Sequence, residues 1–302
     1  MNIESLIKFW SLMYSVIQEF WSITEPHIEE AAVRDEIPIE LYYYSELGLD
    51  YFSIEEFQNR DPFSNTEKFE SLFARLDVKG WIEPVPKERY QVTKQAREAV
   101  RHIIQAGDAH LMGFEPAAGL DLGGLAILLK QIVMANDAAS EPPRKWAINK
   151  RFRVAEKNSP VIVQIREYLM DLFAYRDDSH LSAARPYFNQ AGIVWSVLGS
   201  LWKGEALTPE KMAESLAFRG YDTFDYQIAI QAAVEVGWVE EAEVPGVFHP
   251  TGQGKEIREQ VEKLTNEYFY TPWSVMTQDE LDEMFVLLMK LRDQLDAYRK
   301  SK

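Results

Sequence analysis

Residues 76–98 read LDVKGWIEPVPKERYQVTKQARE, and residues 233–258 read AVEVGWVEEAEVPGVFHPTGQGKEIR. Each stretch has an apolar helix end, a Gly-Trp pair, a short strand, a turn and a second strand. Each closes on a threonine that is followed by a helix-like stretch. The two copies lie about 157 residues apart in a chain of 302 residues. Because a repeat of this size decides the fold, the sequence predicts two related halves.

The residues before the first stretch predict two helices. Ser53 and Glu56 form a capping box, and Ser64 and Glu67 form another, with Thr66 as an alternative cap. The second of these helices has four apolar residues at the spacing of a buried helix face. They are Phe69, Leu72, Phe73 and Leu76. Two strands of a hairpin are expected after this helix, at residues 81–84 and 90–93.

The second copy repeats this order. Thr208 caps a helix that begins with Pro209, a favoured first residue, and Thr223 caps the next helix. The 157-residue offset places four residues on the buried face of that helix. They are Tyr226, Ala229, Ile230 and Ala233. A glutamate-rich hairpin follows.

Long amphipathic helices flank both copies. The first is expected from the N-terminus to Pro26, which interrupts its apolar pattern, and the last follows a capping box of Thr277 and Glu280. The fold class is therefore mainly α with small β-hairpins, as two tandem winged helix-turn-helix units. We expect a first repeat at 1–141, a basic linker at 142–158 and a second repeat at 159–302.

The chain resembles the multiple-antibiotic-resistance (MarR) type of winged-helix regulator over most of each half. The patterns that carry the resemblance are Gly80-Trp81…Tyr90…Thr93 and Gly237-Trp238…Phe248…Thr251-x-x-Gly254. Regulators of this type work as homodimers held together by their terminal helices, so two fused copies resemble a single-chain pseudo-dimer. The resemblance implies DNA binding, transcription regulation and a response to small aromatic molecules. A pseudo-dimer predicts a monomer of 35 kDa.

In a winged helix, the third helix enters the major groove and the wing contacts the backbone. The first copy offers polar and basic residues at these positions. The candidate DNA contacts are Asn65, Thr66, Lys68, Ser71 and Arg75 on the helix, and Lys87 and Arg89 on the wing. The alternative is a solvated helix face of mixed charge.

The second copy departs from this pattern. No Lys or Arg occurs from Tyr221 to Gly254, and Glu240, Glu241 and Glu243 line the wing. Carboxylates repel phosphates, so this copy is not expected to bind DNA in the usual way. The helix carries Ile228 and Ala232 on its outward face, which predicts that the first copy or a partner protein covers it.

Two further segments have open interpretations. The basic run from Arg144 to Lys157 is either a phosphate-contacting arm or a solvated tether whose charges bind acidic surfaces of the same chain. Five aromatic residues are candidates for a pocket between the halves that would take a small aromatic ligand, and core packing is the alternative. They are Trp10, Tyr14, Trp21, Tyr43 and Trp195.

Composition bounds the function. The chain has no cysteine, and its formal charge of −16 argues against a generic polyanion binder. No catalytic residues, cofactor or metal site are indicated, and tandem winged helices in DNA glycosylases are the one enzymatic exception. There is no apolar run long enough for a membrane span and no secretion signal, so we expect a cytoplasmic protein.

Two functions follow from these observations. The first is a transcription-regulator-like protein in which only the first repeat contacts double-stranded DNA. The second is a winged-helix protein that no longer binds DNA and serves as a protein-interaction or ligand-sensing module.

Overall fold

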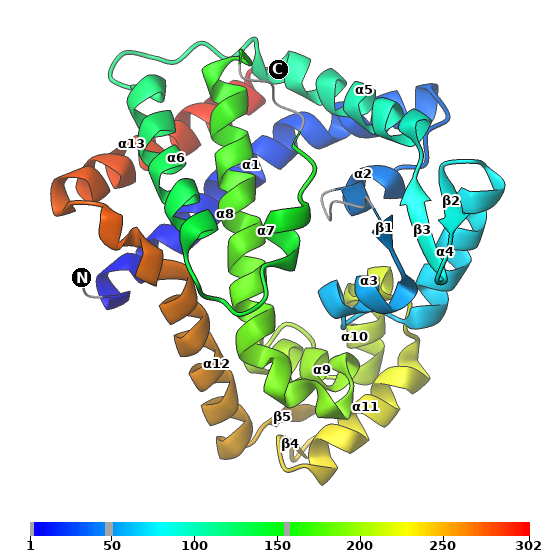
Figure 1. Cartoon of the computed structure of the whole chain (residues 1–302). Coiled ribbons are helices and arrows are strands. Elements are labelled where there is room, and N and C mark those ends of the chain that lie inside the picture. Colours follow the sequence, from blue (N-terminus) through cyan, green and yellow to red (C-terminus); the bar gives the residue numbers. More distant parts are fainter. Residues whose placement is uncertain (1–2, 46–50, 154–157) are drawn as a thin grey trace. The chain divides into compact units, whose positions relative to one another are not determined.

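The computed structural model describes residues 3–45, 51–153 and 158–302, and it is mainly helical with two small sheets (Figure 1). The fold class is thereby confirmed at the level of a mainly α protein with small β elements. The elements, in chain order, are α1 (Ile3–Arg34), α2 (Glu40–Ser45), β1 (Tyr51–Phe52), α3 (Ile54–Arg60), α4 (Thr66–Val78), β2 (Ile82–Val85), β3 (Arg89–Val92), α5 (Lys94–Leu111), α6 (Leu122–Ala138), α7 (Trp146–Lys150), α8 (Val161–Ala184), η1 (Arg185–Gln190), α9 (Gly192–Lys203), α10 (Pro209–Ser215), η2 (Ala217–Arg219), α11 (Thr223–Glu235), β4 (Val239–Glu241), β5 (Phe248–Pro250), α12 (Gly252–Tyr270), η3 (Thr271–Val275) and α13 (Gln278–Lys300).

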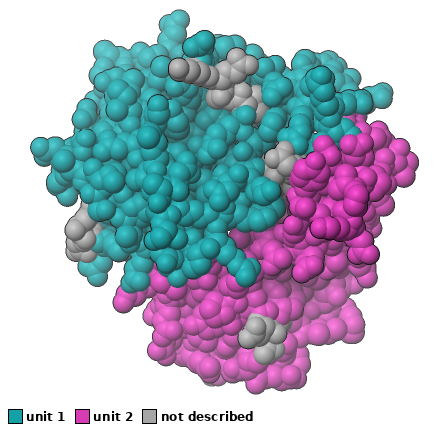
Figure 2. Space-filling model, in the orientation of Figure 1, with its two compact units in different colours: residues 1–50, 92–179, 266–302 teal, residues 51–91, 180–265 magenta. Residues whose placement is uncertain are grey.

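The chain divides into two compact units, which Figure 2 colours separately. Unit 1 comprises residues 1–50, 92–179 and 266–302, and unit 2 comprises residues 51–91 and 180–265. Each unit takes residues from both sequence halves. The two compact units therefore do not coincide with the two repeats predicted along the sequence.

Unit 1 is built around α1. Its buried stripe packs against α5 and α13, and the core continues through apolar residues of α6 and α8. We expected the helix to end at Pro26, and this expectation is wrong, because α1 continues to Arg34. Pro26 is exposed, while Ile28, Ala31 and Ala32 extend the buried face beyond it. Burial of this second stretch offsets the backbone hydrogen bond that proline cannot donate.

Unit 2 contains two similar sets of elements. In the first set, α3 and α4 precede a sheet of order β1-β3-β2, in which Tyr51 pairs with Gln91 and Phe52 with Tyr90. In the second set, α10 and α11 precede the antiparallel pair β4-β5. The helices α4 and α11 are both 13 residues long and begin at the predicted offset. All eight apolar residues predicted for their inner faces are buried.

The helix caps follow the sequence at most positions. The capping boxes at Ser53/Glu56 and Thr277/Glu280 and the cap at Thr208 are confirmed. The box at Ser64/Glu67 is wrong, because Asn65 caps α4 while the Ser64 hydroxyl donates to Asp61.

The cap of α11 is also one residue earlier than predicted. Asp222 rather than Thr223 is its N-cap, and it forms a capping box with Asp225. An aspartate accepts the same backbone N–H bonds as a threonine, so the two neighbouring residues compete for this position. The strand β1 was not predicted, since two residues are too few for an alternating pattern.

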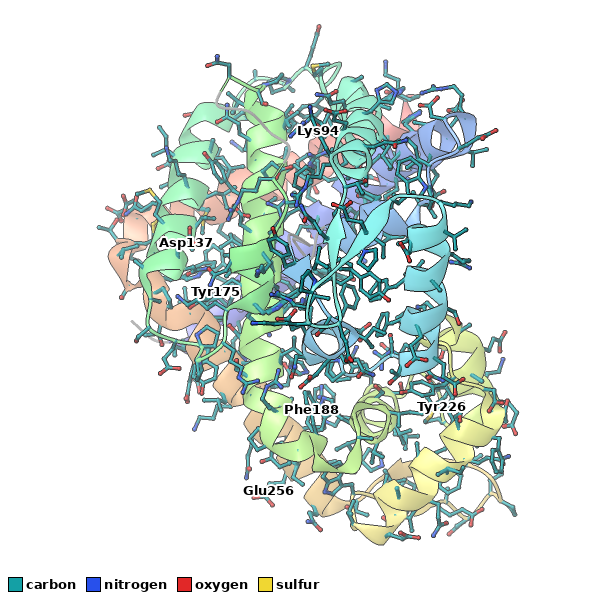
Figure 3. The ribbon with its side chains drawn as sticks, turned by 45° about the vertical axis from the view of Figure 1, so that its right-hand side comes forward. Lys94, Asp137, Tyr175, Phe188, Tyr226 and Glu256 are labelled. Carbon is teal, nitrogen blue, oxygen red and sulfur yellow. The ribbon has the colours of Figure 1, made fainter. Side chains whose placement is uncertain are left out.

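Within unit 2, the two sets of elements pack closely against each other. The rings of Phe63 and Phe188 meet edge to face at 5.5 Å, and Figure 3 labels Phe188. The backbone also approaches closely, because a Cβ added at Gly192 would lie 1.8 Å from the carbonyl oxygen of Pro62. Only glycine permits this contact between α9 and the turn before α4.

We predict that Gly192→Ala lowers the free energy of unfolding by about 1–3 kcal/mol, because the methyl group forces the two backbones apart. Gly199→Ala in the same helix is the control, since a Cβ there has no neighbour within 4 Å. The control should be neutral or gain up to about 1 kcal/mol from the better helix propensity. Chemical denaturation of both variants is the measurement. Equal stability of the two would contradict the close packing at Gly192.

Candidate functional site

The N-terminal end of α4, where sequence predicts base contacts, binds a turn of the second repeat. The Asn65 backbone N–H donates to the Arg219 carbonyl at 2.9 Å, and its side-chain amide donates to the Gly220 carbonyl at 3.2 Å. The Lys68 ammonium donates to the Phe218 carbonyl. The stem of Lys68 also lies against Gly220. Within unit 2, therefore, Asn65 and Lys68 already bind the η2 turn.

The other predicted DNA residues are more dispersed. Thr66 accepts a hydrogen bond from the Gln58 amide, whereas Ser71 and Arg75 are exposed further along α4. Lys87 is exposed at the hairpin tip with a positive φ of 71°. Arg89 is ion-paired with Glu56 at 3.2 Å, and it also donates to the Tyr51 carbonyl at 3.1 Å. These contacts fix the β3 arginine against the body of the domain.

The outward face of α11 is exposed. Phe224 is 65% exposed and Ile228 is 56% exposed, while Ala232 is half-buried. The first copy does not bury Ile228, so the prediction that it covers this face is wrong. The other prediction, that a partner protein covers the face, stays a prediction. Tyr226, on the opposite side of the helix, is fully buried (Figure 3).

The aromatic residues proposed for a ligand pocket lie in different surroundings. Trp10, Tyr14 and Trp21 share contacts with Phe173 in unit 1, and Arg176 lies 4.8 Å above the Trp10 ring. Trp195 is buried in unit 2, where it contacts Tyr187, Phe188 and Trp238 and carries Arg258 over its ring at 4.6 Å.

Tyr43, the fifth candidate, is exposed on α2 and donates to Glu29 at 3.2 Å. Partial burial and the neighbouring Glu25 and Glu29 raise the pKa of Tyr43 to about 12. Of the five candidates, Trp10, Tyr14 and Trp21 therefore gather around Phe173 in unit 1, and Trp195 lies in a separate aromatic cluster formed within unit 2.

A pocket does occur in unit 1, and Trp21 is the only predicted residue that lines it. Its empty volume is about 370 Å³, including the solvent at its open mouth. Among the residues that the structure describes, the pocket is lined by Trp21, Thr24, Ile28, Tyr42, Ile104, Arg151, Phe152, Arg166, Glu167 and Met170. An aromatic and aliphatic wall therefore faces three buried charges.

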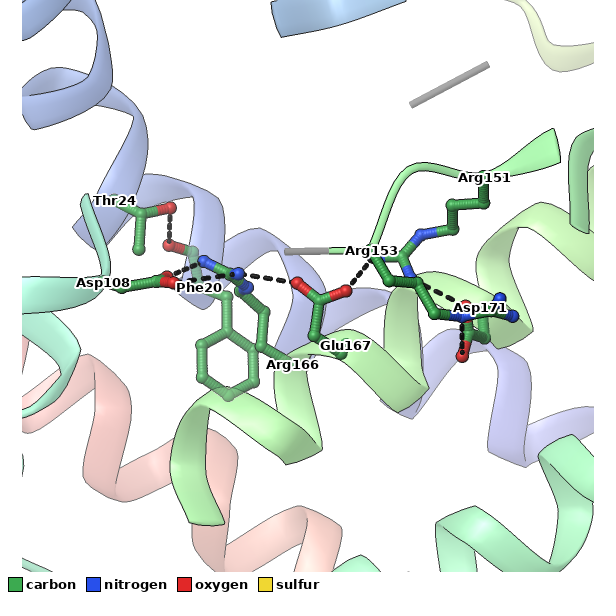
Figure 4. Close-up of polar contacts among 8 residues, drawn as sticks. All are labelled: Phe20, Thr24, Asp108, Arg151, Arg153, Arg166, Glu167 and Asp171. Carbon is green, nitrogen blue, oxygen red and sulfur yellow. Dashed lines mark hydrogen bonds and ion pairs between the residues drawn. The ribbon is translucent and has the colours of Figure 1, made fainter. Parts of the chain in front are cut away.

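These charges belong to a buried ladder of alternating sign, shown in Figure 4. Arg166 is bound to Asp108 and, at 2.7 Å, to Glu167. Arg151 connects Glu167 at 2.8 Å to Asp171 at 2.6 Å. Arg153 closes the ladder at Asp171, at 2.8 Å. Three guanidinium groups thus balance three carboxylates.

The ladder sets the protonation of its carboxylates. Burial raises the pKa of Asp108, and Arg166 offsets only part of that rise. Burial also acts on Glu167, but Arg151 and Arg166 outweigh it and hold the pKa of Glu167 below its usual value. Glu167 therefore stays ionised between two arginines. Sequence reasoning missed this ladder, although charges within the apolar run of α8 are a signal of buried ion pairs.

The described part of the basic run is tied to the same chain. The Lys145 ammonium donates to the Asn136 carbonyl at 2.8 Å, and Arg151 and Arg153 join the ladder. Asp178 accepts the backbone N–H groups of Ala147 and Ile148 at the start of α7. These contacts agree with a tether whose charges bind acidic residues of its own chain, but the expectation that the tether is solvated is wrong for Arg151, which is buried. Lys157, at the end of the run, lies outside the described residues.

A stacked pair of histidines is the other titratable cluster. The rings of His27 and His110 lie parallel, with centroids 3.2 Å apart. Partial burial and the facing His27 lower the pKa of His110, with Lys302 acting in the same direction and Glu30 opposing it. Protonation of this pair would place two positive rings against each other.

Within residues 3–45, 51–153 and 158–302, no three His, Asp or Glu side chains are grouped to hold a metal ion. Every helix in the described ranges is too short or too polar to cross a bilayer.

Removal of one arginine tests the ladder. Arg166→Met should cost about 3–5 kcal/mol of unfolding free energy at neutral pH, because it leaves Asp108 buried without its partner. Arg153→Met is the matched control, and its more exposed guanidinium should cost less than about 1 kcal/mol. Urea denaturation measures both. Similar decreases in the free energy of unfolding of the two variants would show that the buried Arg166–Asp108 pair stabilises the fold no more than the exposed Arg153.

The histidine pair predicts a pH dependence. The pKa of His110 is lower in the folded state than in the unfolded state, so protonation of His110 favours unfolding. The free energy of unfolding is therefore highest above the unfolded pKa of about 6.5 and decreases as the pH falls below that value. Thermal unfolding between pH 7.5 and about 5.5 should therefore show a falling Tm, with a shallower slope in His110→Gln. An unchanged slope in that variant would assign the pH dependence to other groups.

No protein-family model, curated protein or solved structure matches the chain.

Proposed function

We propose that this chain is a tandem winged-helix protein that works as a protein-interaction module rather than by inserting α4 into DNA. The order of helix, helix and hairpin in both halves of unit 2 supports the winged-helix assignment. The similar length and offset of α4 and α11 support the duplication.

The observation that carries the proposal is the contact between α4 and the η2 turn. In helix-turn-helix proteins, the N-terminal residues of the recognition helix contact base edges. Here Asn65 and Lys68 occupy those positions, and both donate to backbone carbonyls of residues 218–220. DNA would have to displace the second repeat before it could reach them.

The charge distribution supports the same conclusion. The second repeat has no Lys or Arg over 34 consecutive residues, from Tyr221 to Gly254, and the whole chain carries a formal charge of −16. Phosphate neutralisation provides most of the affinity of nucleic-acid binding proteins, so the long-range field of this chain opposes association.

One-sided DNA binding is the second candidate. It is favoured by Ser71, Arg75 and Lys87, which are exposed on α4 and on its wing. In that case Arg75 and Lys87 would contact phosphates, and Ser71 would face the groove. Regulation of transcription would then depend on these residues alone.

We predict that labelled duplexes, of random sequence and from the gene's own upstream region, show no change in fluorescence anisotropy with this protein at about 50 mM salt. At that ionic strength, six to ten phosphate contacts would gain orders of magnitude in affinity. Binding that weakens with salt and is lost in Arg75→Glu/Lys87→Glu would overturn the proposal. Lys130→Glu/Lys255→Glu is the control for net charge, since both lysines are exposed and lie outside the α4 wing.

A further inference from the structure

The outward side of α11 carries two large apolar side chains at the surface. Phe224 and Ile228 are one helical turn apart, so they form a continuous apolar ridge. Both are more than half exposed. Single exposed apolar residues are ordinary, whereas adjacent large apolar side chains form a contiguous exposed patch, which makes this helix face a candidate interaction site.

The same face is acidic at its far end. Gln231 and Glu235 continue the line of Phe224 and Ile228 along α11, because each lies within about 40° of it at 100° per residue. We call these four residues the α11 face. Both polar members are exposed, and the Gln231 amide donates to Glu235 at 3.3 Å.

Glu235 is placed where a negative charge is unfavourable. It is the last residue of α11, at the negative end of the helix dipole, and the last turn contains no basic residue. Strand β4, which packs against α11, adds the exposed carboxylates Glu240 and Glu241. His249 lies 3.5 Å from Glu240 and is the nearest group that can take a positive charge on that hairpin. A cation at this end of α11 would be attracted both by the Glu235 carboxylate and by the negative end of the helix dipole.

From these observations we infer that the α11 face binds a cationic amphipathic helix of a partner protein. The apolar side of the partner would pack on Phe224 and Ile228, since an i, i+4 ridge fits the groove of a second helix. Lysine or arginine side chains would lie against Glu235 and the β4 carboxylates, where complementary charge sets specificity and association rate. Nucleic acid is unsuited to this surface because both are negative. The inference rests on the proposed function and names the chemistry of its partner.

The test uses the full chain and a defined probe. The probe is a fluorescein-labelled 18-residue peptide of leucine and lysine in which the leucines repeat at i, i+3, i+4 and i+7. A second peptide replaces every lysine with glutamate, and a third has the same composition in an order that is not amphipathic. Fluorescence anisotropy should rise only with the first peptide, and its affinity should fall with added salt.

Three double variants, one of which is a control, then locate the site. Phe224→Ser/Ile228→Ser should weaken binding of the cationic peptide at least tenfold. Ile127→Ser/Met134→Ser is the matched control, because these apolar residues on α6 are 68% and 61% exposed, and it should leave binding unchanged. Glu235→Gln/Glu240→Gln should weaken binding and reduce its salt dependence. All four apolar side chains lie at the surface, so circular dichroism and Tm should stay at wild-type values.

Several results would overturn the inference. They are the absence of binding at about 100 μM peptide, equal binding of the glutamate or non-amphipathic peptide, and equal affinity in the Phe224→Ser/Ile228→Ser variant. A fourth is self-association of the wild-type chain that this variant abolishes, which would assign the face to a second copy. The proposed function is tested separately by the duplex-binding experiment. DNA binding that depends on Arg75 and Lys87 would contradict the proposed function, and peptide binding does not affect that result.

Discussion

The arrangement of unit 2 depends on Arg219. Its guanidinium lies over the Phe63 ring at 5.2 Å and donates to the Ser196 hydroxyl, while its carbonyl accepts the backbone N–H of Asn65. Burial lowers the pKa of this arginine, with Asp61 opposing the shift. Arg219 is half-buried, and the ring and the acceptors around its guanidinium fix the η2 turn against the start of α4. The exposed side of α11 follows from that constraint, because the first repeat is held at the η2 turn and leaves Phe224 and Ile228 uncovered.

The helices α4 and α11 show how one fold supports two surfaces. Their inner faces use the same four positions, since a short helix on a hairpin must bury one apolar stripe. Their outer faces have no such requirement. Lys68 and Ser71 correspond by the repeat offset to Asp225 and Ile228, and the change alters charge and hydropathy without altering the backbone. Two helices with the same buried positions can therefore present different binding chemistry on their outer faces.

Sequence reasoning predicted what local physics determines. Caps at Ser53, Thr208 and Thr277 and the buried faces of α4 and α11 depend on a few neighbouring residues, and they were found. The continuation of α1 past Pro26 depends on packing against α5, which is 60 or more residues away and invisible to a local pattern. The contacts of Asn65 and Lys68 with the η2 turn, about 150 residues further along the chain, were missed for the same reason. The only indication of the ladder in the sequence was the presence of Arg166, Glu167 and Asp171 within the apolar run of α8, which does not identify their partners.

The ladder also bears on what the unit 1 pocket can bind. Asp108, Glu167 and Asp171 each have an arginine partner, and the three arginines carry the same total charge with the opposite sign. An anion placed here would compete with carboxylates that are already positioned and desolvated, so it would gain little. The ladder is therefore better suited to hold α5, α8 and the segment after α7 together than to recognise a charged ligand. This leaves the exposed α11 face, where carboxylates stand in water beside apolar side chains, as the surface with the larger capacity to bind a partner.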